Sequence, residues 1–205
     1  MSFLELADDD ADELLILGDW AELLWSNMNI LTTVKPYSYV TEKVRSIASR
    51  KPVRCVAGNH DWSIALFASA IEPVKIVSPF AEKGVYYCHG FEFDWLSLIT
   101  GTPVDPIYWK NAFPFIAPWA FPMWLATRVW AEAEATYHWG IAMIHELARS
   151  YAVEKGYHTV VLGHTHFPAA EVRGGVQIYN TGDMMSSYTY LVEEDGRIEL
   201  KHFGG

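Results

Sequence analysis

Short apolar runs, each closed by a glycine or a polar residue, recur along this chain. Four of them contain four or five residues, and several are rich in valine: Leu14–Leu17, Val53–Ala57, Val85–Cys88 and Thr159–Leu162. Short apolar runs that are bounded in this way are typical of buried β-strands. Between them, the apolar positions of Tyr37–Arg50 recur every three to four residues, which predicts an amphipathic helix.

The remaining segments complete an alternation of strands and helices. Ser2–Leu6 resembles the end of a helix, and the acidic triplet Asp8–Asp10 then predicts a turn. Trp20–Leu31 has mixed spacing and fits either a loop or a short helix, and Trp62–Ala70 predicts a helix. Further strands are expected at Val74–Val77, Glu171–Arg173, Val176–Asn180, Ser187–Glu193 and Arg197–His202, the last two joined by a turn at Asp195-Gly196.

Residues 91–151 depart from this alternation. Their first part is rich in Trp, Phe and Pro and has no clear period, whereas Trp124–Tyr151 has apolar residues at helical spacing. We interpret 91–151 as a helical, aromatic-rich cap inserted into a single domain that spans 1–205. The cap fits a ligand site, a lipid contact or a homodimer interface, and these alternatives stay open.

Polar residues that suit metal binding directly follow the four short strands. They are Asp19 in Gly18-Asp19, Asn59 in Gly58-Asn59-His60-Asp61, His89, and His164 with His166 in Gly-His-Thr-His. The ends of strands in an open α/β sheet are where ligands bind. Carboxylate, amide and imidazole groups hold Mn, Fe, Co or Zn. Each piece alone also fits an ordinary turn, but their conjunction predicts a metal-centred hydrolase.

Local spacing suggests further roles at two of these positions. In an extended segment, His164 and His166 would lie on the same side and face one metal cluster. His60 beside Asp61 suits acid catalysis, because a protonated imidazole held by a carboxylate can donate a proton to a leaving oxygen.

Charge and composition narrow the partners. The formal net charge of −10 argues against nucleic acid as the main partner, while a bound cation would still admit a small phosphorylated substrate. Cys55 and Cys88 lie in expected core strands and are interpreted as buried hydrophobic residues. No signal peptide is apparent, which favours a cytoplasmic location. The apolar stretch Asn111–Thr127 is short and contains three prolines, so a transmembrane span is not expected.

Taken together, these motifs resemble the calcineurin-like metallophosphoesterase superfamily, from about Leu14 to Gly182. The family pattern is Asp-x-His, then Gly-Asp, Gly-Asn-His-Asp/Glu, His and Gly-His-x-His. The resemblance implies an α/β fold of two mixed β-sheets packed as a sandwich and flanked by helices. The segments His89–Asp94 and Tyr179–Asp183 and the helical insertion are similar to the branch of UDP-diacylglucosamine hydrolases.

The resemblance also implies a role for each motif residue. Asp19 would bridge two divalent metals, with manganese first and iron, zinc or cobalt as alternatives. Asn59, His89 and His164 would complete one metal site, and His166 would serve the other. His60 would act near the leaving group, positioned by Asp61. The implied reaction is hydrolysis of a phosphoester or diphosphate bond by metal-activated water.

One family motif is missing. Only seventeen residues precede Gly18, and they contain neither an Asp-x-His nor a strand that could carry it. We expect either that the natural chain is longer, which makes this one N-terminally truncated relative to the family, or that the protein holds one metal and has weak or no turnover. The alternative function is a non-catalytic scaffold that binds a partner or lipid through the aromatic cap.

Overall fold

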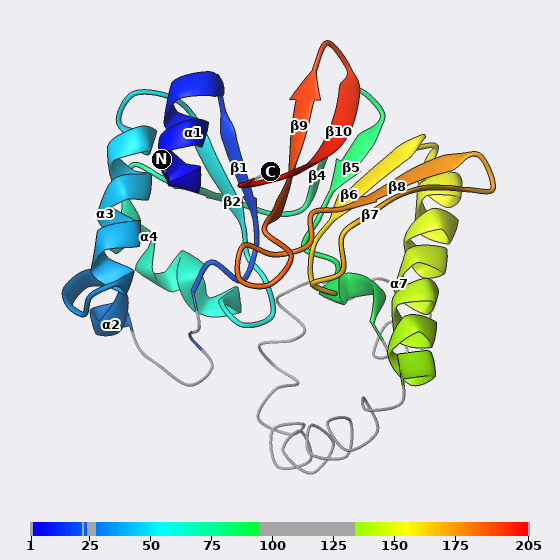
Figure 1. The fold of residues 1–205 in the computed structure, drawn as a ribbon, viewed down its shortest axis with the longest axis horizontal. Coiled ribbons are helices and arrows are strands. Elements are labelled where there is room, and N and C mark those ends of the chain that lie inside the picture. The colour runs from blue at the N-terminus through cyan, green and yellow to red at the C-terminus, as the bar shows by residue number, and fades with distance from the viewer. Residues whose placement is uncertain (1, 22, 24–27, 95–133, 205) are drawn as a thin grey trace.

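Two β-sheets face each other and carry helices on their outer sides (Figure 1). The computed structural model describes residues 2–21, 23, 28–94 and 134–204. The first sheet has the order β1 (Leu14–Leu17), β2 (Val53–Val56) and β3 (Lys75–Val77). The second has the order β4 (Phe80–Glu82), β5 (Val85–Tyr87), β6 (Thr159–Leu162), β8 (Val176–Asn180) and β7 (Ala169–Arg173). A separate hairpin consists of β9 (Thr189–Glu194) and β10 (Arg197–His202).

The strand directions confirm the predicted α/β class and the sandwich of two sheets. In the second sheet β5, β6 and β8 are parallel, and the outer strands β4 and β7 are antiparallel to their neighbours. This sheet is mixed, as expected. The described strands of the first sheet are all parallel. Parallel pairing requires a crossover between strands, and α3 (Tyr37–Ala48) supplies the one between β1 and β2.

One core cluster fills the space between the two sheets. Leu17 and Val56 of the first sheet pack in one cluster with Val85, Tyr87 and Val161 of the second. The strand β6 is buried along its whole length, because the other sheet covers one face and a helix covers the other. This double burial explains why its sequence, Thr-Val-Val-Leu, is a nearly continuous apolar run.

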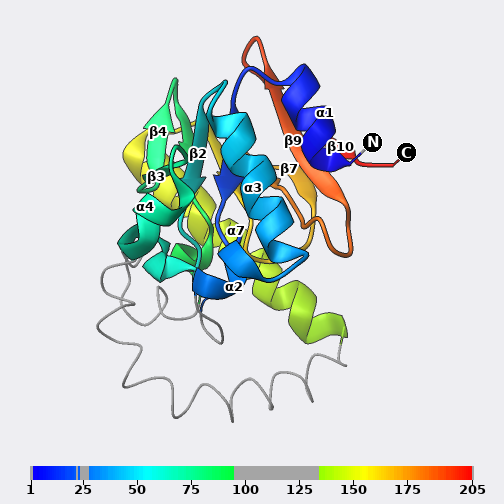
Figure 2. The same cartoon turned by 90° about the vertical axis from the view of Figure 1, so that its left-hand side faces the viewer.

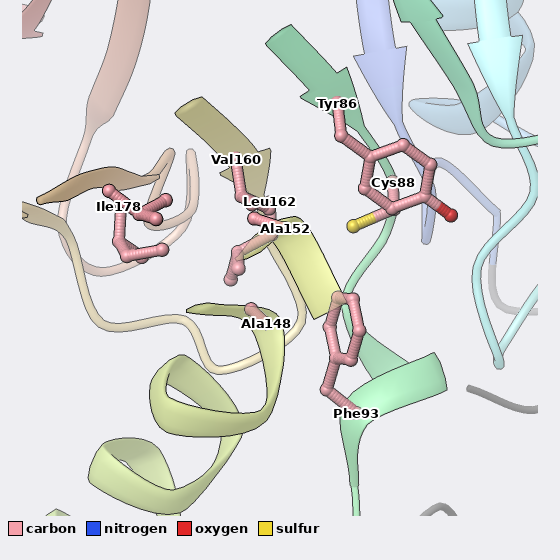
Figure 3. Close-up of a cluster of buried hydrophobic side chains, with 9 residues drawn as sticks. Tyr86, Cys88, Phe93, Ala148, Ala152, Val160, Leu162 and Ile178 are labelled. Atoms are coloured by element: carbon pink, nitrogen blue, oxygen red, sulfur yellow. The ribbon is translucent and has the colours of Figure 1, made fainter. Parts of the chain in front are cut away.

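Helices close the outer faces (Figures 1 and 2). The helix α3 packs on the first sheet through Val44 and Ile47, which contact Val53 and Cys55. On the second sheet, the helix α7 (Glu134–Lys155) places Ala148 and Ala152 against β6 and β8, as Figure 3 shows. Small side chains let this helix approach the sheet closely. The short elements α2 (Met28–Thr33), η1 (Trp62–Phe67), α4 (Ala68–Ile71) and η2 (Phe91–Phe93) complete the described chain.

The N-terminal segment corrects one prediction. Asp8–Asp10 was expected to form a turn, but it is the last turn of helix α1 (Phe3–Asp10), which starts with a capping box between Ser2 and Glu5. Asp8 forms ion pairs with Lys43 of the neighbouring helix α3 and with Arg50, two residues beyond its end. These cations compensate a charge that would otherwise oppose the negative end of the helix dipole.

Two further elements differ from the sequence prediction. The strand β4 was not predicted, because it has three residues and only one, Phe80, is a strong strand former. The helix expected at Trp62–Ala70 is instead a 3₁₀ helix, η1, followed by the single-turn helix α4. Both free cysteines, Cys55 and Cys88, are fully buried, as predicted.

Only part of the predicted cap at 91–151 falls within the described residues. That part is η2 and α7, and α7 packs against β6 and β8 as an outer layer of the sandwich. The tryptophan-rich remainder, 95–133, lies outside the described residues, and with it the predicted ligand, lipid and dimer roles of the cap. Among the described helices, none combines the length and the apolarity that crossing a bilayer requires.

A substitution in α7 tests its helical assignment. Gly140 lies inside the helix, and a Cβ atom there would meet no heavy atom within 4 Å. Because glycine costs about 0.5–1 kcal/mol relative to alanine in a helix interior, Gly140→Ala is expected to raise the free energy of unfolding by that amount. Equilibrium unfolding in urea measures the change, and a decrease would contradict the helical conformation at this position.

Candidate metal centre

Four of the predicted ligands converge where two pairs of parallel strands end, one pair in each sheet. Asp19 and Asn59 follow β1 and β2 of the first sheet, and His89 and His164 follow β5 and β6 of the second. The potential donor atoms of Asp19, His89 and His164 all lie within 4.8 Å of one another. Asn59 Oδ1 lies 3.1 Å from His89 Nε2 and 3.0 Å from His164 Nδ1. The two sheets thus bring together side chains that are up to 145 residues apart in the sequence.

A backbone contact between the sheets fixes the tautomer of His89. Its Nδ1 lies 2.5 Å from the carbonyl oxygen of Leu17, at the end of β1. Since a carbonyl can only accept a hydrogen bond, Nδ1 carries the proton and Nε2 is the atom turned toward Asp19 Oδ2, 3.1 Å away. A ring held in this way by its second nitrogen is the usual arrangement of a metal-binding histidine.

The charges of the cluster favour a cation. Burial alone would raise the pKa of Asp19, but the hydrogen bond and charge of His89 hold it well below the usual range. Burial alone would lower the pKa of His89, but Asp19 raises it to about 9. Burial lowers the pKa of His164 to about 3, so this ring is neutral at pH 7. The positive charge beside the Asp19 carboxylate is thus supplied by protonated His89, and a bound cation could take the place of that proton.

The donor set fits a divalent metal. The atoms that face one another are a carboxylate oxygen, the amide oxygen of Asn59 and two imidazole nitrogens, and all four can coordinate a cation. Oxygen and nitrogen together suit manganese, iron, cobalt or zinc, and only one of the four groups is anionic.

A close turn positions Asp19. Both Gly18 and Asp19 have positive φ angles, +84° and +53°, and Gly58 packs directly against them. The backbone N–H of His60 donates a 2.9 Å hydrogen bond to Asp19 Oδ1. One carboxylate oxygen therefore contacts His89 and the other is held by the next loop, an arrangement that sets the orientation of the group.

Asp61 is fully buried and holds this loop through the backbone. Its Oδ1 accepts a 2.6 Å hydrogen bond from the N–H of Gly58, and its Oδ2 accepts one of 3.2 Å from the N–H of Ala21. Burial raises the pKa of Asp61, and the Gly58 hydrogen bond opposes that rise. These contacts join the two loops that carry Asp19 and Asn59.

Asp61→Asn is expected to lower the free energy of unfolding by about 1–3 kcal/mol. The NH₂ of the new amide would face one of the two backbone N–H groups and could not accept its hydrogen bond. The matched control is Asp12→Asn, since Asp12 is exposed. Urea unfolding of both variants measures the difference. Equal stability of the two variants would show that the buried hydrogen bonds do not hold the loop.

The segment that carries His164 and His166 contradicts the expected extended conformation. Both residues have left-handed φ angles, +65° and +59°, so strand alternation does not apply and the argument that placed both rings on one cluster is wrong. His164 turns into the cluster, whereas the side chain of His166 is 55% exposed and its Nδ1 lies 3.1 Å from Asp183 Oδ2. Non-glycine residues with such φ angles are uncommon and concentrate at functional sites.

Three side chains near the cluster were not predicted as site residues. The buried amide of Asn180 donates to the carbonyl oxygen of Gly163 (2.7 Å) and to the hydroxyl of Thr165 (2.9 Å), and so holds the loop of His164. Asp183 accepts from three backbone N–H groups and from Ser186 Oγ, which fixes its carboxylate beside His166. Glu92 is buried and accepts from the N–H of Gly90 through Oε2. The Tyr179–Asp183 segment, which spans the end of β8, was the available hint for the first two.

Comparisons with known proteins yield a family match over most of the chain. The sequence model for calcineurin-like phosphoesterases matches residues 2–168. Solved structures that are similar to the chain include a novel archaeal phosphodiesterase, with 12% sequence identity, coverage of 97% of this chain and 87% of that chain, and a TM-score of 0.45. Another is a Thermotoga maritima protein solved by NMR in solution, with 14% identity, coverage of 93% and 98%, and a TM-score of 0.40. Both scores lie below 0.5, so neither similarity bears on function. A search of curated proteins finds no significant match.

Proposed function

Because this chain belongs to the calcineurin-like phosphoesterase family, we propose that it hydrolyses phosphoester or diphosphate bonds at the cluster of Asp19, Asn59, His89 and His164. Family membership supports phosphoester hydrolysis in general. The observation that carries the assignment to these residues is the convergence of four metal-type donors from the ends of β1, β2, β5 and β6.

A divalent metal ion is proposed to bind between these four donors. When bound, such an ion would lower the pKa of a water molecule and would place positive charge against the phosphate oxygens. Asp19 provides the negative charge, and His89 and His164 provide neutral nitrogens once a cation replaces the proton of His89. Manganese is the first candidate, and the cytoplasm is the proposed location of the reaction.

A second ion is proposed at His166. Its Nδ1 donates a hydrogen bond to Asp183, which leaves Nε2 to bind the ion. Asp183 is itself held by backbone hydrogen bonds, so it restrains the ring of His166. Asp19 carries two oxygens on different sides of its carboxylate, which suits a group shared between two ions.

His60 is proposed as the general acid. Its backbone N–H is bound to Asp19, so its half-buried side chain starts from a loop that is tied directly to the metal ligand. Proton donation to a leaving oxygen requires that the ring, in its protonated form, reach the scissile bond while the phosphate lies at the cluster. Asp61 acts through the loop, since its observed hydrogen bonds go to the backbone of Gly58 and Ala21.

Metal content and turnover test the function together. The protein is expected to retain at least one transition metal per chain after gel filtration and to hydrolyse a generic aryl phosphate diester. Chelation should abolish turnover and the addition of Mn²⁺ should restore it. Less than one metal per chain without turnover would instead favour the alternative, a non-catalytic scaffold of the same fold.

His60→Ala is expected to reduce hydrolysis of the diester by about 10²-fold or more while the metal is retained, which is the usual scale for lost acid catalysis. The control is His202→Ala, which removes an exposed histidine from β10. Steady-state rates and elemental analysis are measured on both variants. An unchanged rate would remove His60 from the mechanism.

A further inference from the structure

Glu92 is a buried carboxylic residue that the proposed reaction does not use. It lies in η2, two residues after Gly90, and is only 2% exposed. Its Oε2 accepts a 2.6 Å hydrogen bond from the N–H of Gly90. Among the described residues, its Oε1 is buried and has no hydrogen-bond partner. Burying a carboxylate with one unpaired oxygen costs free energy, so its presence at this position calls for an explanation.

The hydrogen bond to Glu92 holds one end of the peptide group between His89 and Gly90. At the other end of this group, the carbonyl oxygen of His89 accepts a 2.8 Å hydrogen bond from the N–H of Gly163. Gly163 directly precedes His164, so the peptide group connects the two loops that carry the histidine ligands. Because both its N–H and its carbonyl are bonded, its orientation is fixed, and with it the backbone that carries the ring of His89.

The two loops approach each other closely at this peptide group. A Cβ atom added to Gly90 would lie 3.2 Å from the Cβ atom of His164, closer than most Cβ atoms approach a neighbour. The ring centroids of His89 and His164 are 5.1 Å apart. The buried ring of Phe91 lies beside both, 5.8 Å from His89 and 6.4 Å from His164 between centroids. A rotation of the peptide group would therefore displace the ring of His89 against that of His164.

Glu92 acts on the cluster without belonging to it. Among the residues that the structure describes, the donors within 4.8 Å of one another come from Asp19, His89 and His164. Burial raises the pKa of Glu92, and the charge of His89 opposes that rise, so the two side chains interact electrostatically. The one hydrogen bond of the carboxylate nevertheless goes to the backbone, at the N–H of Gly90.

We propose that Glu92 is a positioning residue for the metal centre. By accepting the hydrogen bond from Gly90, it holds the His89–Gly90 peptide group in the orientation that turns Nε2 of His89 toward Asp19. The proposal rests on the proposed metal site. Loss of an outer partner of a metal ligand usually reduces metal affinity by about 10–100-fold, and we expect an effect of this size when Gly90 loses its acceptor.

Glu92→Met and Glu92→Gln isolate the hydrogen bond from the charge. Both variants lack the negative charge and have side chains of similar length, but only glutamine keeps an oxygen that can accept from Gly90. Glu92→Met is therefore expected to bind Mn²⁺ about tenfold or more weakly than Glu92→Gln, as measured by calorimetry. In the metal-free chain, the Nδ1 proton of His89, which is bonded to Leu17, should move upfield by NMR in Glu92→Met relative to Glu92→Gln.

Phe93→Leu is the control for a general loosening of η2. Phe93 lies in the same short helix but packs in the cluster of Tyr86 and Ala148, on the side of α7 (Figure 3). The substitution leaves a cavity and lowers stability, which urea unfolding confirms. Its Mn²⁺ affinity and the Nδ1 proton of His89 should nevertheless match those of the unsubstituted chain.

The two measurements keep the positioning role separate from the proposed function. If the unsubstituted chain bound no Mn²⁺, the proposed function would fail, and the Nδ1 proton of His89 in the metal-free variants would still decide whether Glu92 positions the ring. Equal Mn²⁺ affinities of Glu92→Met and Glu92→Gln would overturn the proposal. So would an unmoved Nδ1 proton in Glu92→Met, or a loss of affinity in Phe93→Leu as large as that in Glu92→Met.

Discussion

Replacing Asp19 with asparagine is expected to remove metal binding and to reduce diester hydrolysis by about a thousandfold or more. Asp19 is the only carboxylate among the described residues of the four-donor cluster. Asparagine has the same shape and can keep the hydrogen bond from the N–H of His60, so the loop should stay in place. The substitution therefore tests the loss of the negative charge of Asp19 alone. A metal contributes several kcal/mol to a charged transition state, and about 4 kcal/mol corresponds to a thousandfold.

Elemental analysis after gel filtration and steady-state kinetics measure this effect. Metal affinity should fall by more than the 10–100-fold that is usual when only an outer partner of a ligand is lost. Asp195→Asn is the matched control: Asp195 also has a positive φ angle, +51°, but lies in the β9–β10 turn, away from the cluster. If Asp19→Asn retained metal and turnover at the level of Asp195→Asn, the cluster would not be the metal site.

The sequence allowed the strands of the site to be predicted because most of their residues are apolar and buried. The strand β6 is buried along its whole length, and β2 is buried at every position except Arg54. The residue that follows each run is then at a strand end, and parallel strands bring their ends together. The convergence of Asn59 with His89 and His164 follows from this topology within each sheet and from the packing of the two sheets against each other. The topology itself came from the family resemblance, since the order of strands in a sheet is not a local property.

The backbone conformation of the loops could not be predicted from the pattern of apolar and polar residues. The left-handed φ angles of His164 and His166 are imposed by contacts from elsewhere, such as the hydrogen bonds that Asn180 makes to Gly163 and Thr165. No pattern within His164–His166 encodes them. The link between His166 and Asp183 spans 17 residues and depends on the turn at Asp183, which was predicted only as part of a family-like segment.

Tertiary contacts also explain the error at the N-terminus. Three consecutive aspartates disfavour a helix end on local grounds, because like charges lie close together at the negative end of the dipole. In the folded chain, Asp8 has Lys43 of α3 and Arg50, just after α3, as partners, and the main-chain oxygen of Asp8 accepts a hydrogen bond from Lys51. The cations come from more than thirty residues away, so the local sequence could not reveal them.

Gly18→Ala is expected to lower the free energy of unfolding by about 2–5 kcal/mol and to abolish metal binding. The φ angle of Gly18 is +84°, where a residue with a Cβ atom costs about 1–2 kcal/mol. The new Cβ atom would also collide with the ring of His89 and lie 2.7 Å from the Cα atom of Gly58. Overpacking of this kind adds about 1–3 kcal/mol.

Gly196→Ala separates the two causes. Gly196 has a similar φ angle, +75°, but a Cβ atom there would meet no heavy atom within 4 Å. This control should therefore show the conformational cost alone, about 1–2 kcal/mol, with normal metal content. Urea unfolding and elemental analysis are compared for the two variants. The collision with His89 displaces the ring whose Nδ1 is bound to Leu17, so only Gly18→Ala should move Nε2 away from Asp19. Equal losses of stability in both variants, with metal retained in both, would mean that the close approach of the β1 and β2 loops does not build the site.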